Sequence, residues 1–352
     1  MKAILLAGGQ GTRLRPLTLH TPKPIVPIFD RPFLRYQIDL VRQIPEIDEV
    51  ILSLNYQPDR IEDVFGDGSS LGVKIRYVVE PEPLGTGGAI KYAARGVTGS
   101  VVVFNGDVLT QIDLADVIAL HRARRARATI VLTPVDNPTA YGLVETHADG
   151  RVKRFLEKPK ADEITTNRIN AGMYVLEPDT FDRIPDSVPW SIERKYFPSL
   201  VERNETFVAY VYEGYWIDIG THEKYRQVHR DIMDGRFATE PFAGAPASRI
   251  VSAPGASIAP DATLEGPCFI DAGVVIGAGA RIGPHTVIGR GARIGEGASI
   301  TDSIVWPDCR IESGASVRHA ILGRRCHLGP HVTLDGDAVL GDDTVLTAHS
   351  RA

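Results

Sequence analysis

One regularity in the C-terminal part of the sequence restricts the fold more than any other feature. Branched aliphatic residues recur every six positions from residue 258 to residue 300, and the period resumes after five-residue steps at 305 and 322. A helix would need apolar spacings of three and four, which this stretch lacks. A six-residue period predicts a solenoid of about five coils, with short strands that each stack one aliphatic side chain inward. The periodic residues are Ile258, Leu264, Ile270, Ile276, Ile282, Ile288, Ile294, Ile300, Val305, Ile311, Val317, Leu322, Leu328, Leu334, Leu340 and Leu346.

The sequence before this repeat has a different composition. The chain has 352 residues, and at about 150 residues per domain this length predicts two domains. The last lysine is Lys224, whereas residues 251–352 hold 15 of the 34 glycines and only two aromatic residues. The stretch between the two parts is rich in Ala, Pro and Gly, as linkers are. We predict a first domain at residues 1–235, a linker at 236–250 and the solenoid at 251–352.

The first 235 residues alternate between apolar runs and helix-like stretches. Nearly continuous apolar strands separated by helices predict an α/β domain whose mainly parallel, doubly wound, Rossmann-like sheet is covered on both faces. Ligands of such sheets bind at the carboxyl ends of the strands, here after Ala7, Glu80 and Phe104. The predicted strands are 3–7, 50–54, 75–79 and 101–104, and the predicted helices are 33–43, 57–65, 86–95 and 113–126.

Charge and cysteine content disfavour several classes of protein. The formal net charge is −5, which makes nucleic acid an unexpected partner. No apolar run reaches the roughly 18 residues that a membrane span needs. The short apolar N-terminus runs directly into glycines, which favours a buried strand over a signal peptide. Cys268, Cys309 and Cys326 form no CxxC motif and cannot all pair, so we expect core thiols and a cytoplasmic location.

The turn after the first predicted strand is rich in glycine and carries cationic side chains. Residues 8–13 read GGQGTR, so backbone N–H groups can converge on an anion while Arg13 adds a fork of donors. Lys23 follows between two prolines, which hold it as a rigid point charge for phosphate. The pattern is neither a GxGxxG nor a P-loop motif. A plain glycine turn is the alternative for the three glycines alone.

Two aspartates are candidate metal ligands. Asp107 follows the predicted strand at 101–104, and Asp218 lies inside an apolar stretch. A carboxylate in such a place needs a partner, and Mg²⁺ held by one or two carboxylates and by substrate phosphates would provide it. Alternatively, each aspartate caps a turn beside the neighbouring Gly106 or Gly220.

Seven motifs, in order, resemble the sugar-nucleotide pyrophosphorylases, a family of nucleotidyltransferases that act on sugar 1-phosphates. They cover the chain up to residue 220, and the hexapeptide-repeat left-handed β-helix that is common at the C-terminus in this family extends the resemblance to the rest. The resemblance therefore implies an α/β catalytic domain followed by a left-handed parallel β-helix. The motifs are residues 4–27 (ILLAGGQGTRLRPLTLHTPKPIVP), 80–89 (EPEPLGTGGA), 105–107 (NGD), 141–142 (YG), 155–159 (FLEKP), 170–174 (NAGMY) and 216–220 (WIDIG).

Within the family, residues 169–174, 191–193 and 197–198 resemble the branch that transfers guanylyl groups to mannose 1-phosphate. The sequence Asn105-Gly106-Asp107 departs from the Asn-Ser-Asp that eukaryotic members of this branch tend to carry. Thymidylyl or uridylyl transfer to glucose 1-phosphate therefore stays an alternative. Chemistry gives a separate indication, because a carboxylate at Glu80 could accept both adjacent donors of guanine. Glu80 could equally be a solvated strand end.

The resemblance implies in-line attack of the sugar phosphate on the α-phosphorus of a nucleoside triphosphate, with pyrophosphate leaving. The catalytic residues would be Arg13, Lys23, Asp107 and Asp218, with Mg²⁺ on Asp107 and Asp218. The nucleotide would be bound by Gly8, Gly9, Gly11, Thr12, Arg13, Glu80, Gly85 and Thr86. The sugar phosphate would be bound by Gly142, Glu157, Lys158 and Asn170.

Two readings from other classes stay open. Hexapeptide β-helices also occur as acyltransferases with a histidine base, so a bifunctional enzyme that uses a histidine of the repeat is one of them. A non-catalytic protein that senses sugar nucleotides is the other, although the four candidate catalytic residues are present. We also expect a homo-oligomer, because the ends and faces of a solenoid need a cover. The histidines of the repeat are His285, His319, His327, His331 and His349.

Overall fold

The structure is a computed structural model that describes residues 1–246 and 248–352. The chain forms two compact units that do not follow its linear order. Unit 1 comprises Met1–Gln10 and Leu34–Asp218, and unit 2 comprises Gly11–Phe33 and Ile219–Ala352. An N-terminal segment therefore belongs to the same unit as the C-terminal repeat.

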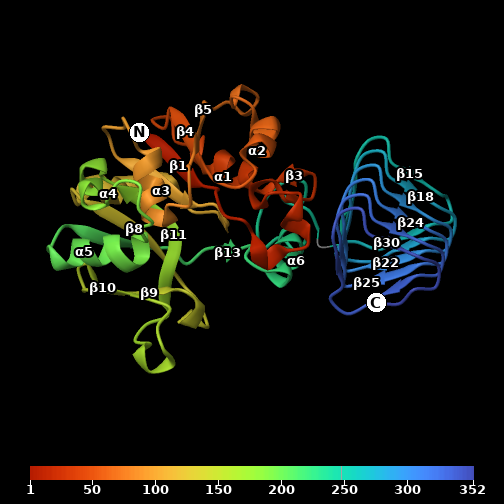
Figure 1. The fold of residues 1–352 in the computed structure, drawn as a ribbon. Helices are drawn as coiled ribbons and strands as arrows, with labels where there is room; N and C mark the ends of the chain where they lie inside the picture. The colour runs from red at the N-terminus through yellow and green to blue at the C-terminus, as the bar shows by residue number, and fades with distance from the viewer. Residues whose placement is uncertain (247) are drawn as a thin grey trace. The chain divides into compact units, whose positions relative to one another are not determined.

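Unit 1 is built on a nine-stranded sheet whose main strand order is β10-β9-β11-β6-β1-β4-β5 (Figure 1). The other two strands branch from β11, because β8 pairs with β11 and β12 pairs with β8. β1, β4, β5 and β6 run parallel to one another, whereas β11 is antiparallel to β6, β8 and β9. The sheet is thus Rossmann-like and mixed. Its strands are β1 (Lys2–Leu6), β4 (Glu49–Leu54), β5 (Ile75–Val79), β6 (Val101–Asn105), β8 (Ala128–Pro134), β9 (Gly142–Thr146), β10 (Val152–Glu157), β11 (Arg168–Leu176) and β12 (Phe207–Val211).

The predicted strands and helices of the first domain are confirmed to within three residues at each end. The helices that connect the strands are α1 (Phe33–Val41), α2 (Pro58–Phe65), α3 (Gly85–Ala93) and α4 (Leu114–Ala123). A π-helical turn, η8 (Ile192–Tyr196), leads into α5 (Phe197–Glu202). A separate two-stranded sheet pairs β7 (Val108–Thr110) with β13 (Trp216–Asp218).

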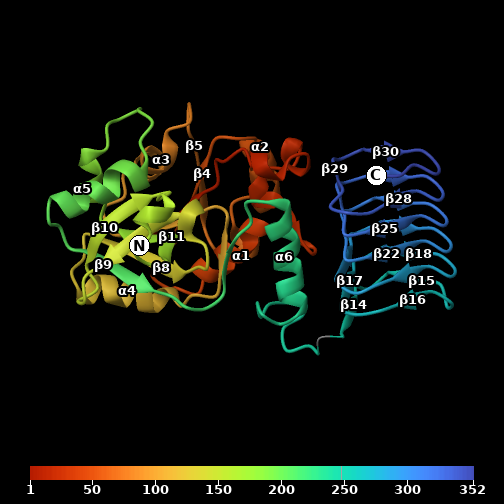
Figure 2. The ribbon, with the colours of Figure 1, turned by 90° about the horizontal axis from the view of Figure 1, so that it is seen from below.

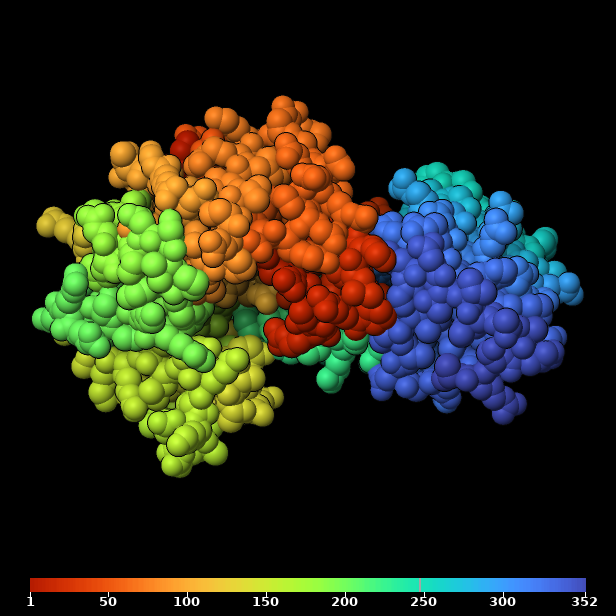
Figure 3. Space-filling view, viewed as in Figure 1, coloured from red at the N-terminus to blue at the C-terminus, as the bar shows by residue number. Residues whose placement is uncertain are grey.

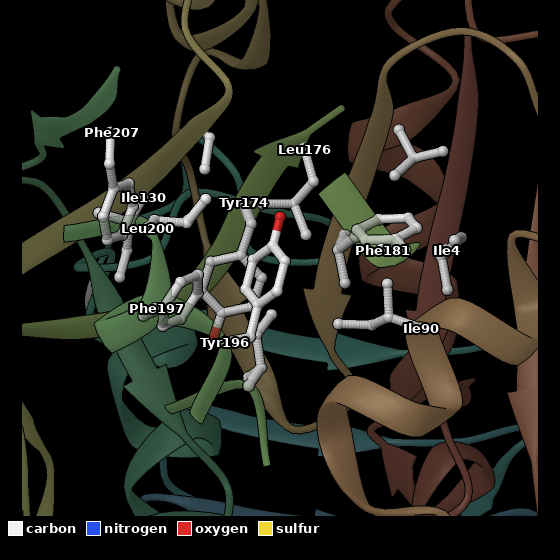
Figure 4. Packing of buried hydrophobic residues seen from close by; sticks show 14 of the residues in the cluster. Ile4, Ile90, Ile130, Tyr174, Leu176, Phe181, Tyr196, Phe197, Leu200 and Phe207 are labelled. Atoms are coloured by element: carbon white, nitrogen blue, oxygen red, sulfur yellow. The ribbon is translucent and has the colours of Figure 1, made fainter. Parts of the chain in front are cut away.

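Aromatic side chains form a large part of the core of unit 1. Figure 4 shows Tyr174 of β11 next to Tyr196 and Phe197, which belong to the η8–α5 segment. The Phe197 ring lies 5.1 Å from that of Tyr174 and stacks on Phe207 at 5.2 Å. Burial of apolar surface stabilises the fold by about 25 cal/mol per Å². This packing fixes the η8–α5 segment against β11 and β12.

The C-terminal repeat folds into three parallel sheets of stacked strands, as a left-handed β-helix has (Figure 2). The sheets have six, six and five strands, so the predicted five coils are present with part of a sixth. In Figure 3 the colour of this repeat changes from cyan to dark blue along the chain. The strands of the first sheet are β14 (Ile250–Ser252), β17 (Cys268–Ile270), β20 (Thr286–Ile288), β23 (Ile304–Val305), β26 (Ile321–Leu322) and β29 (Val339–Leu340). Those of the second are β15 (Ser257–Ile258), β18 (Val275–Ile276), β21 (Arg293–Ile294), β24 (Arg310–Ile311), β27 (His327–Leu328) and β30 (Val345–Leu346), and those of the third are β16 (Thr263–Leu264), β19 (Arg281–Ile282), β22 (Ser299–Thr301), β25 (Ser316–Arg318) and β28 (Thr333–Leu334).

The predicted inward positions of the repeat are confirmed. All of the periodic aliphatic residues belong to the solenoid core or pack against it. Both five-residue steps fall at the corner between the third and the first sheet, after Ile300 and after Val317. The strands therefore keep their register across the shortened corners, and Ile300 stays opposite Val317. The three cysteines lie in this core as free thiols, as expected.

The outer face of the first sheet is apolar and is covered within unit 2. Phe269 on β17 is 3% exposed and its ring lies 5.3 Å from that of Phe29. Helix α6 (His222–Met233) contributes Tyr225, whose ring meets Trp306 at its edge. The segment Gly11–Phe33 contains short helices η1 (Thr12–Leu14), η2 (Leu17–Leu19) and η3 (Lys23–Ile25) and the hairpin of β2 (Pro27–Ile28) and β3 (Arg31–Pro32).

Within residues 1–246 and 248–352, none of the helices has the length and apolar composition that crossing a membrane requires.

Candidate active site

Two aspartates occupy neighbouring backbone positions beyond the carboxyl end of β6. A tight turn through Gly106 and Asp107 joins β6 to β7. A Cβ at Gly106 would lie 2.2 Å from the carbonyl oxygen of Leu6, so glycine is needed where the turn passes the end of β1. β13 pairs with β7 and sets Asp218 opposite Val108, the neighbour of Asp107. Strand pairing therefore places the two predicted metal ligands in adjacent positions.

Tyr141 orients one of these carboxylates. Its hydroxyl donates a hydrogen bond of 2.9 Å to Oδ1 of Asp218. Its ring meets the ring of Trp216 edge-on at 5.7 Å, and Nε1 of Trp216 donates to the carbonyl of Ala171. Asp218 is only 9% exposed, so this hydrogen bond fixes a largely buried carboxylate.

The glycines after β1 differ in their surroundings. A Cβ at Gly8 would lie 3.1 Å from the backbone nitrogen of Asn55, just beyond β4. Gly9 is exposed, with nothing within 4 Å of the position of a Cβ. Gly8 therefore lets two strand ends approach closely, whereas Gly9 leaves an open stretch of backbone.

Glu80 is buried at the end of β5 and has internal partners. Its Oε2 accepts from the backbone N–H of Leu84 at 2.9 Å, and its Oε1 accepts from Ser53 at 3.2 Å. Burial raises the pKa of Glu80, and these two hydrogen bonds offset only part of that effect. The solvated strand end considered from sequence is therefore wrong. Each carboxylate oxygen can still accept a second hydrogen bond.

Gly85 and Thr86 begin α3 and pack against the segment before η8. Gly85 has φ +67°, and a Cβ there would lie 3.0 Å from the carbonyl oxygen of Trp190. The Thr86 hydroxyl donates to Oε2 of Glu193 at 2.8 Å and accepts from the N–H of Ile192 at 2.9 Å. The start of α3 and the carboxylate of Glu193 are thus held together.

Gly142 and Glu157 face each other across the β9–β10 pair. A Cβ at Gly142 would lie 3.0 Å from Oε2 of Glu157, so the glycine leaves room for the carboxylate. Burial raises the pKa of Glu157, and the nearby charge of Glu193 raises it further. Lys158 follows with φ 51°, and its N–H donates to the carbonyl of Tyr141.

Asn170 lies on β11 and is held on both sides. Its Nδ2 donates to the hydroxyl of Tyr174 at 2.8 Å, and its Oδ1 accepts from the N–H of Gly172 at 2.9 Å. Asn105 lies near this group, because a Cβ at Gly172 would lie 2.8 Å from Nδ2 of Asn105. Oδ1 of Asn105 is buried, with no hydrogen-bond partner in the part of the chain that the structure describes.

The remaining predicted residues lie in unit 2. Gly11 has φ +61°, and the hydroxyl of Thr18 donates to its carbonyl at 2.8 Å. A Cβ at Gly11 would lie 3.3 Å from Cβ of Lys23, so the glycine turn packs directly on the base of this lysine. Thr12 and Arg13 are exposed. A Cβ at Gly220, just before α6, would lie 2.8 Å from Nη2 of Arg13, so this glycine gives the guanidinium room.

Comparison with known families agrees with this arrangement. The family model described as Nucleotidyl transferase matches residues 2–235, and the model described as GMPPB C-terminal domain matches residues 264–350. This chain belongs to the nucleotidyl transferase family.

Several known proteins resemble this nucleotidyl transferase. Mannose-1-phosphate guanylyltransferase of Mycobacterium tuberculosis is 41% identical over 75% of this chain and 73% of its own length. Mannose-1-phosphate guanyltransferase of Schizosaccharomyces pombe is 36% identical over 98% of this chain and 92% of its own length. Among solved structures, HddC from Yersinia pseudotuberculosis complexed with GMP-PN matches with a TM-score of 0.54 and 31% identity, over 64% of this chain and 96% of that one.

Nucleotidyl transferases generally use a divalent metal ion. In the described parts of this chain, no three or more His, Cys, Asp or Glu side chains group as a closed metal site. The neighbouring backbone positions of Asp107 and Asp218 and their carboxylate oxygens fit a hard cation that keeps positions open for phosphate oxygens and water. The donor set therefore suits a metal that is completed by substrate.

Three side chains of this nucleotidyl transferase were not predicted as site residues. Tyr141 and Glu193 lie inside motifs that the sequence shows, yet their partners come from segments that are distant along the chain. Asn105 directly precedes the Gly106-Asp107 turn, and its buried oxygen is visible only in three dimensions. All three residues lie in motifs that carry the family resemblance, but their spacing in the sequence could not show what each side chain contacts.

Proposed function

We propose that this nucleotidyl transferase catalyses GTP + mannose 1-phosphate → GDP-mannose + pyrophosphate. Relatives that carry the name mannose-1-phosphate guanylyltransferase or guanyltransferase support this reaction, since two of them align over 97% and 98% of the chain. A structurally similar protein complexed with GMP-PN supports a guanine nucleotide. The observation that carries the chemistry is the β7–β13 register, which pairs Asp218 with Val108, the residue that follows Asp107.

Transfer proceeds by in-line attack of a sugar phosphate oxygen on the α-phosphorus, and no protein nucleophile is needed. Catalysis then rests on positioning and on stabilising negative charge. The backbone of Gly8, Gly9, Gly11 and Thr12 binds the triphosphate, and Arg13 contacts the β- and γ-phosphates. Lys23 faces the α-phosphate, where charge develops in the transition state.

Asp107 and Asp218 hold Mg²⁺ in this proposal. When bound, the ion neutralises the developing charge on the phosphates. The hydrogen bond from Tyr141 keeps one oxygen of Asp218 fixed, so the pair of carboxylates is oriented before substrate arrives. Such preorganisation lowers the cost of reaching the transition state.

Two sets of residues in unit 1 select the substrates, one for the nucleotide and one for the sugar phosphate. Glu80, Gly85 and Thr86 bind the nucleotide, with the carboxylate of Glu80 accepting from guanine. Lys158 pairs with the sugar phosphate. The carboxylate of Glu157, the backbone of Gly142 and the amide of Asn170 bind sugar hydroxyls.

The organisation of the whole protein is part of the proposal. Residues 1–235 would form the catalytic domain, 236–250 a linker, and 251–352 a β-helix that mediates homo-oligomer formation. Residue 247 of that linker lies outside the described residues. The three free core thiols support a cytoplasmic location.

Pyrophosphate release with Mg²⁺ tests the reaction. GTP, UTP, dTTP and ATP would each be combined with mannose 1-phosphate and glucose 1-phosphate. The expected maximum is GTP with mannose 1-phosphate. A maximum at dTTP or UTP with glucose 1-phosphate would refute guanylyl transfer while leaving the proposed mechanism in place. If no substrate pair released pyrophosphate while nucleotides still bound, the chain would be a non-catalytic nucleotide-binding protein.

A further inference from the structure

One corner of the solenoid carries a column of charged and imidazole side chains. The corner between the third and the first sheet presents His285, Asp302, His319 and Asp337 on consecutive coils, each with φ between 50° and 72°. The His319 ring joins two members of this corner column. Its Nδ1 lies 2.7 Å from Oδ2 of Asp302, and its Nε2 lies 3.0 Å from Oδ1 of Asp337.

The corner column is paired with α6 along the length of that helix. Arg226, Arg230 and Asp234 are spaced four residues apart and so lie on one helix face. Nε of Arg230 donates to Oδ1 of Asp302 at 2.9 Å, and Nη2 donates to Oδ2. Arg226 donates to Asp337. The C-cap residue of α6, Asp234, lies 2.7 Å from Nε2 of His285.

These pairs are more than exposed surface contacts. Arg226 is 7% exposed and the side chain of Asp302 is 25% exposed, whereas that of Asp337 is 68% exposed. Burial alone would raise the pKa of Asp302, but the hydrogen bonds from Arg230 and His319 outweigh it, and the pKa is lowered. Removing either carboxylate takes a partner from a guanidinium on α6, and for Arg226 the charge left behind is largely buried, which is unfavourable. The corner column therefore fixes the position of α6 on the solenoid.

Helix α6 in turn holds the segment Gly11–Phe33. The Tyr225 hydroxyl donates to the carbonyl of Pro27 and accepts from Nε1 of Trp306. One turn later, Nε2 of His229 accepts from the N–H of Phe29 at 3.3 Å. At the start of the helix, Arg13 lies against Gly220. The segment that carries Arg13 and Lys23 is thus tied to the same helix that the corner column holds.

We infer that the corner column, through Asp302, His319 and Asp337, is a positioning element for nucleotidyl transfer, acting through α6 on the segment that carries Arg13 and Lys23. The inference rests on the proposed function, because it assigns these two cations to the phosphates. Its physical basis is that misplacing a reacting group by about 1 Å can cost on the order of 100-fold in rate. None of these charged residues belongs to the apolar core of the solenoid, so we expect the fold of the solenoid to be retained without them.

The test is the Asp302→Asn, Asp337→Asn variant of the full chain, which removes both charges with little change in shape. We expect kcat/KM for GTP to fall about tenfold or more. Backbone hydrogen exchange should become faster in residues 11–33 and α6, while β17 and β20 keep their protection. The matched control is Asp335→Asn, Asp343→Asn, which breaks ion pairs with Arg318 and Arg325 between neighbouring coils of the solenoid.

Each outcome decides the question. Variant and control with the same kcat/KM and the same exchange in residues 11–33 would overturn the inference. A variant that lost protection throughout the solenoid would also overturn it, because the column would then be structural. The single variants Arg230→Met and Asp302→Asn and their combination form a double-mutant cycle. If their effects on kcat/KM simply multiply, the two residues act independently, which would count against a shared role. If the wild type released no pyrophosphate with any substrate pair, the proposed function would be refuted. The hydrogen-exchange measurement would still show whether the corner column holds residues 11–33 and α6 in place.

Discussion

The hydroxyl of Tyr141 donates a 2.9 Å hydrogen bond to Oδ1 of Asp218. A hydrogen bond to a charged group contributes about 1.5–3 kcal/mol. Tyr141→Phe should therefore lower kcat about tenfold and raise the Mg²⁺ concentration needed for half-maximal activity. Steady-state rates over a Mg²⁺ titration measure both effects. Tyr77→Phe is the control, since that hydroxyl bonds to the backbone of Gly66. An unchanged Mg²⁺ dependence would contradict a role for Asp218 in metal binding.

Asp107→Asn and Asp218→Asn should each reduce kcat about 100-fold or more, because the carboxylates are proposed to hold the metal that neutralises phosphate charge. Circular dichroism should stay as in the wild type. Asp113→Ala is a matched control, because it removes an aspartate that caps α4 and should cost about 1 kcal/mol of stability with turnover retained. Turnover near that of the wild type in Asp107→Asn with Mg²⁺ would show that the metal site is elsewhere.

Glu80→Gln should weaken the preference for GTP. The amide can still accept from Leu84, but it no longer offers two carboxylate oxygens to the donors of guanine. The ratio of kcat/KM for GTP to that for UTP should fall about tenfold, the value of roughly 1.4 kcal/mol of discrimination. Ser53→Ala removes the other internal bond of Glu80 and serves as control. A ratio that stays constant in Glu80→Gln excludes base reading by this residue.

Glu193→Gln should change the pH profile for the sugar phosphate. The pKa of Glu157 is raised by burial and, second, by the charge of Glu193. If ionised Glu157 accepts sugar hydroxyls, kcat/KM for mannose 1-phosphate rises with pH as Glu157 loses its proton. Removing the neighbouring charge lowers that pKa, so the rise should move to lower pH. The amide oxygen can still accept from Thr86, and a profile that does not move would separate Glu157 from sugar binding.

His229 should make the fold sensitive to acid. Burial lowers the pKa of His229 from 6.5 to about 4, so the native state resists protonation. Above pH 6.5 the ring is neutral in both states and has no effect. As pH falls from 6.5 toward 4, only the unfolded state gains a proton, and about 1.4 kcal/mol of stability is lost per pH unit. Urea unfolding at pH 7.5 and pH 5 should show this loss in the wild type. His229→Gln keeps an acceptor for Phe29 and should lack this part of the loss; an equal loss in both proteins would count against it.

The sequence predicts the solenoid well because each coil repeats the same local environment. Ile276 contacts Ile294 of the next coil as it does Ile258 of the previous one, so the period alone fixes which side chain points inward. The predicted strands of unit 1 were found for a related reason, because buried parallel strands are continuous apolar runs. Strand β11 behaves differently, since it joins β6, β8 and β9 in antiparallel pairs that depend on contacts between distant segments.

The sequence predicted which residues belong to the candidate site more fully than it predicted their hydrogen-bond partners and neighbours. Asp107 and Asp218 were both expected, and the β7–β13 register explains how they become neighbours. The bonds of Glu80 to Ser53 and Leu84, and of Thr86 to Glu193, could not be read from spacing. Neither could the membership of Gly11–Phe33 in unit 2, which depends on packing such as that of Phe29 on Phe269.

That packing has a consequence for biosynthesis. Phe29 leaves the ribosome early, whereas Phe269 and the rest of the first solenoid sheet follow only after most of the chain has been made. A nascent chain that has emerged as far as α6 still lacks the surface on which Phe29 and the segment Gly11–Phe33 pack. Contacts between such distant residues form late and slowly. The segment Gly11–Phe33 would therefore complete its packing only late in translation, after the first sheet of the solenoid has been made.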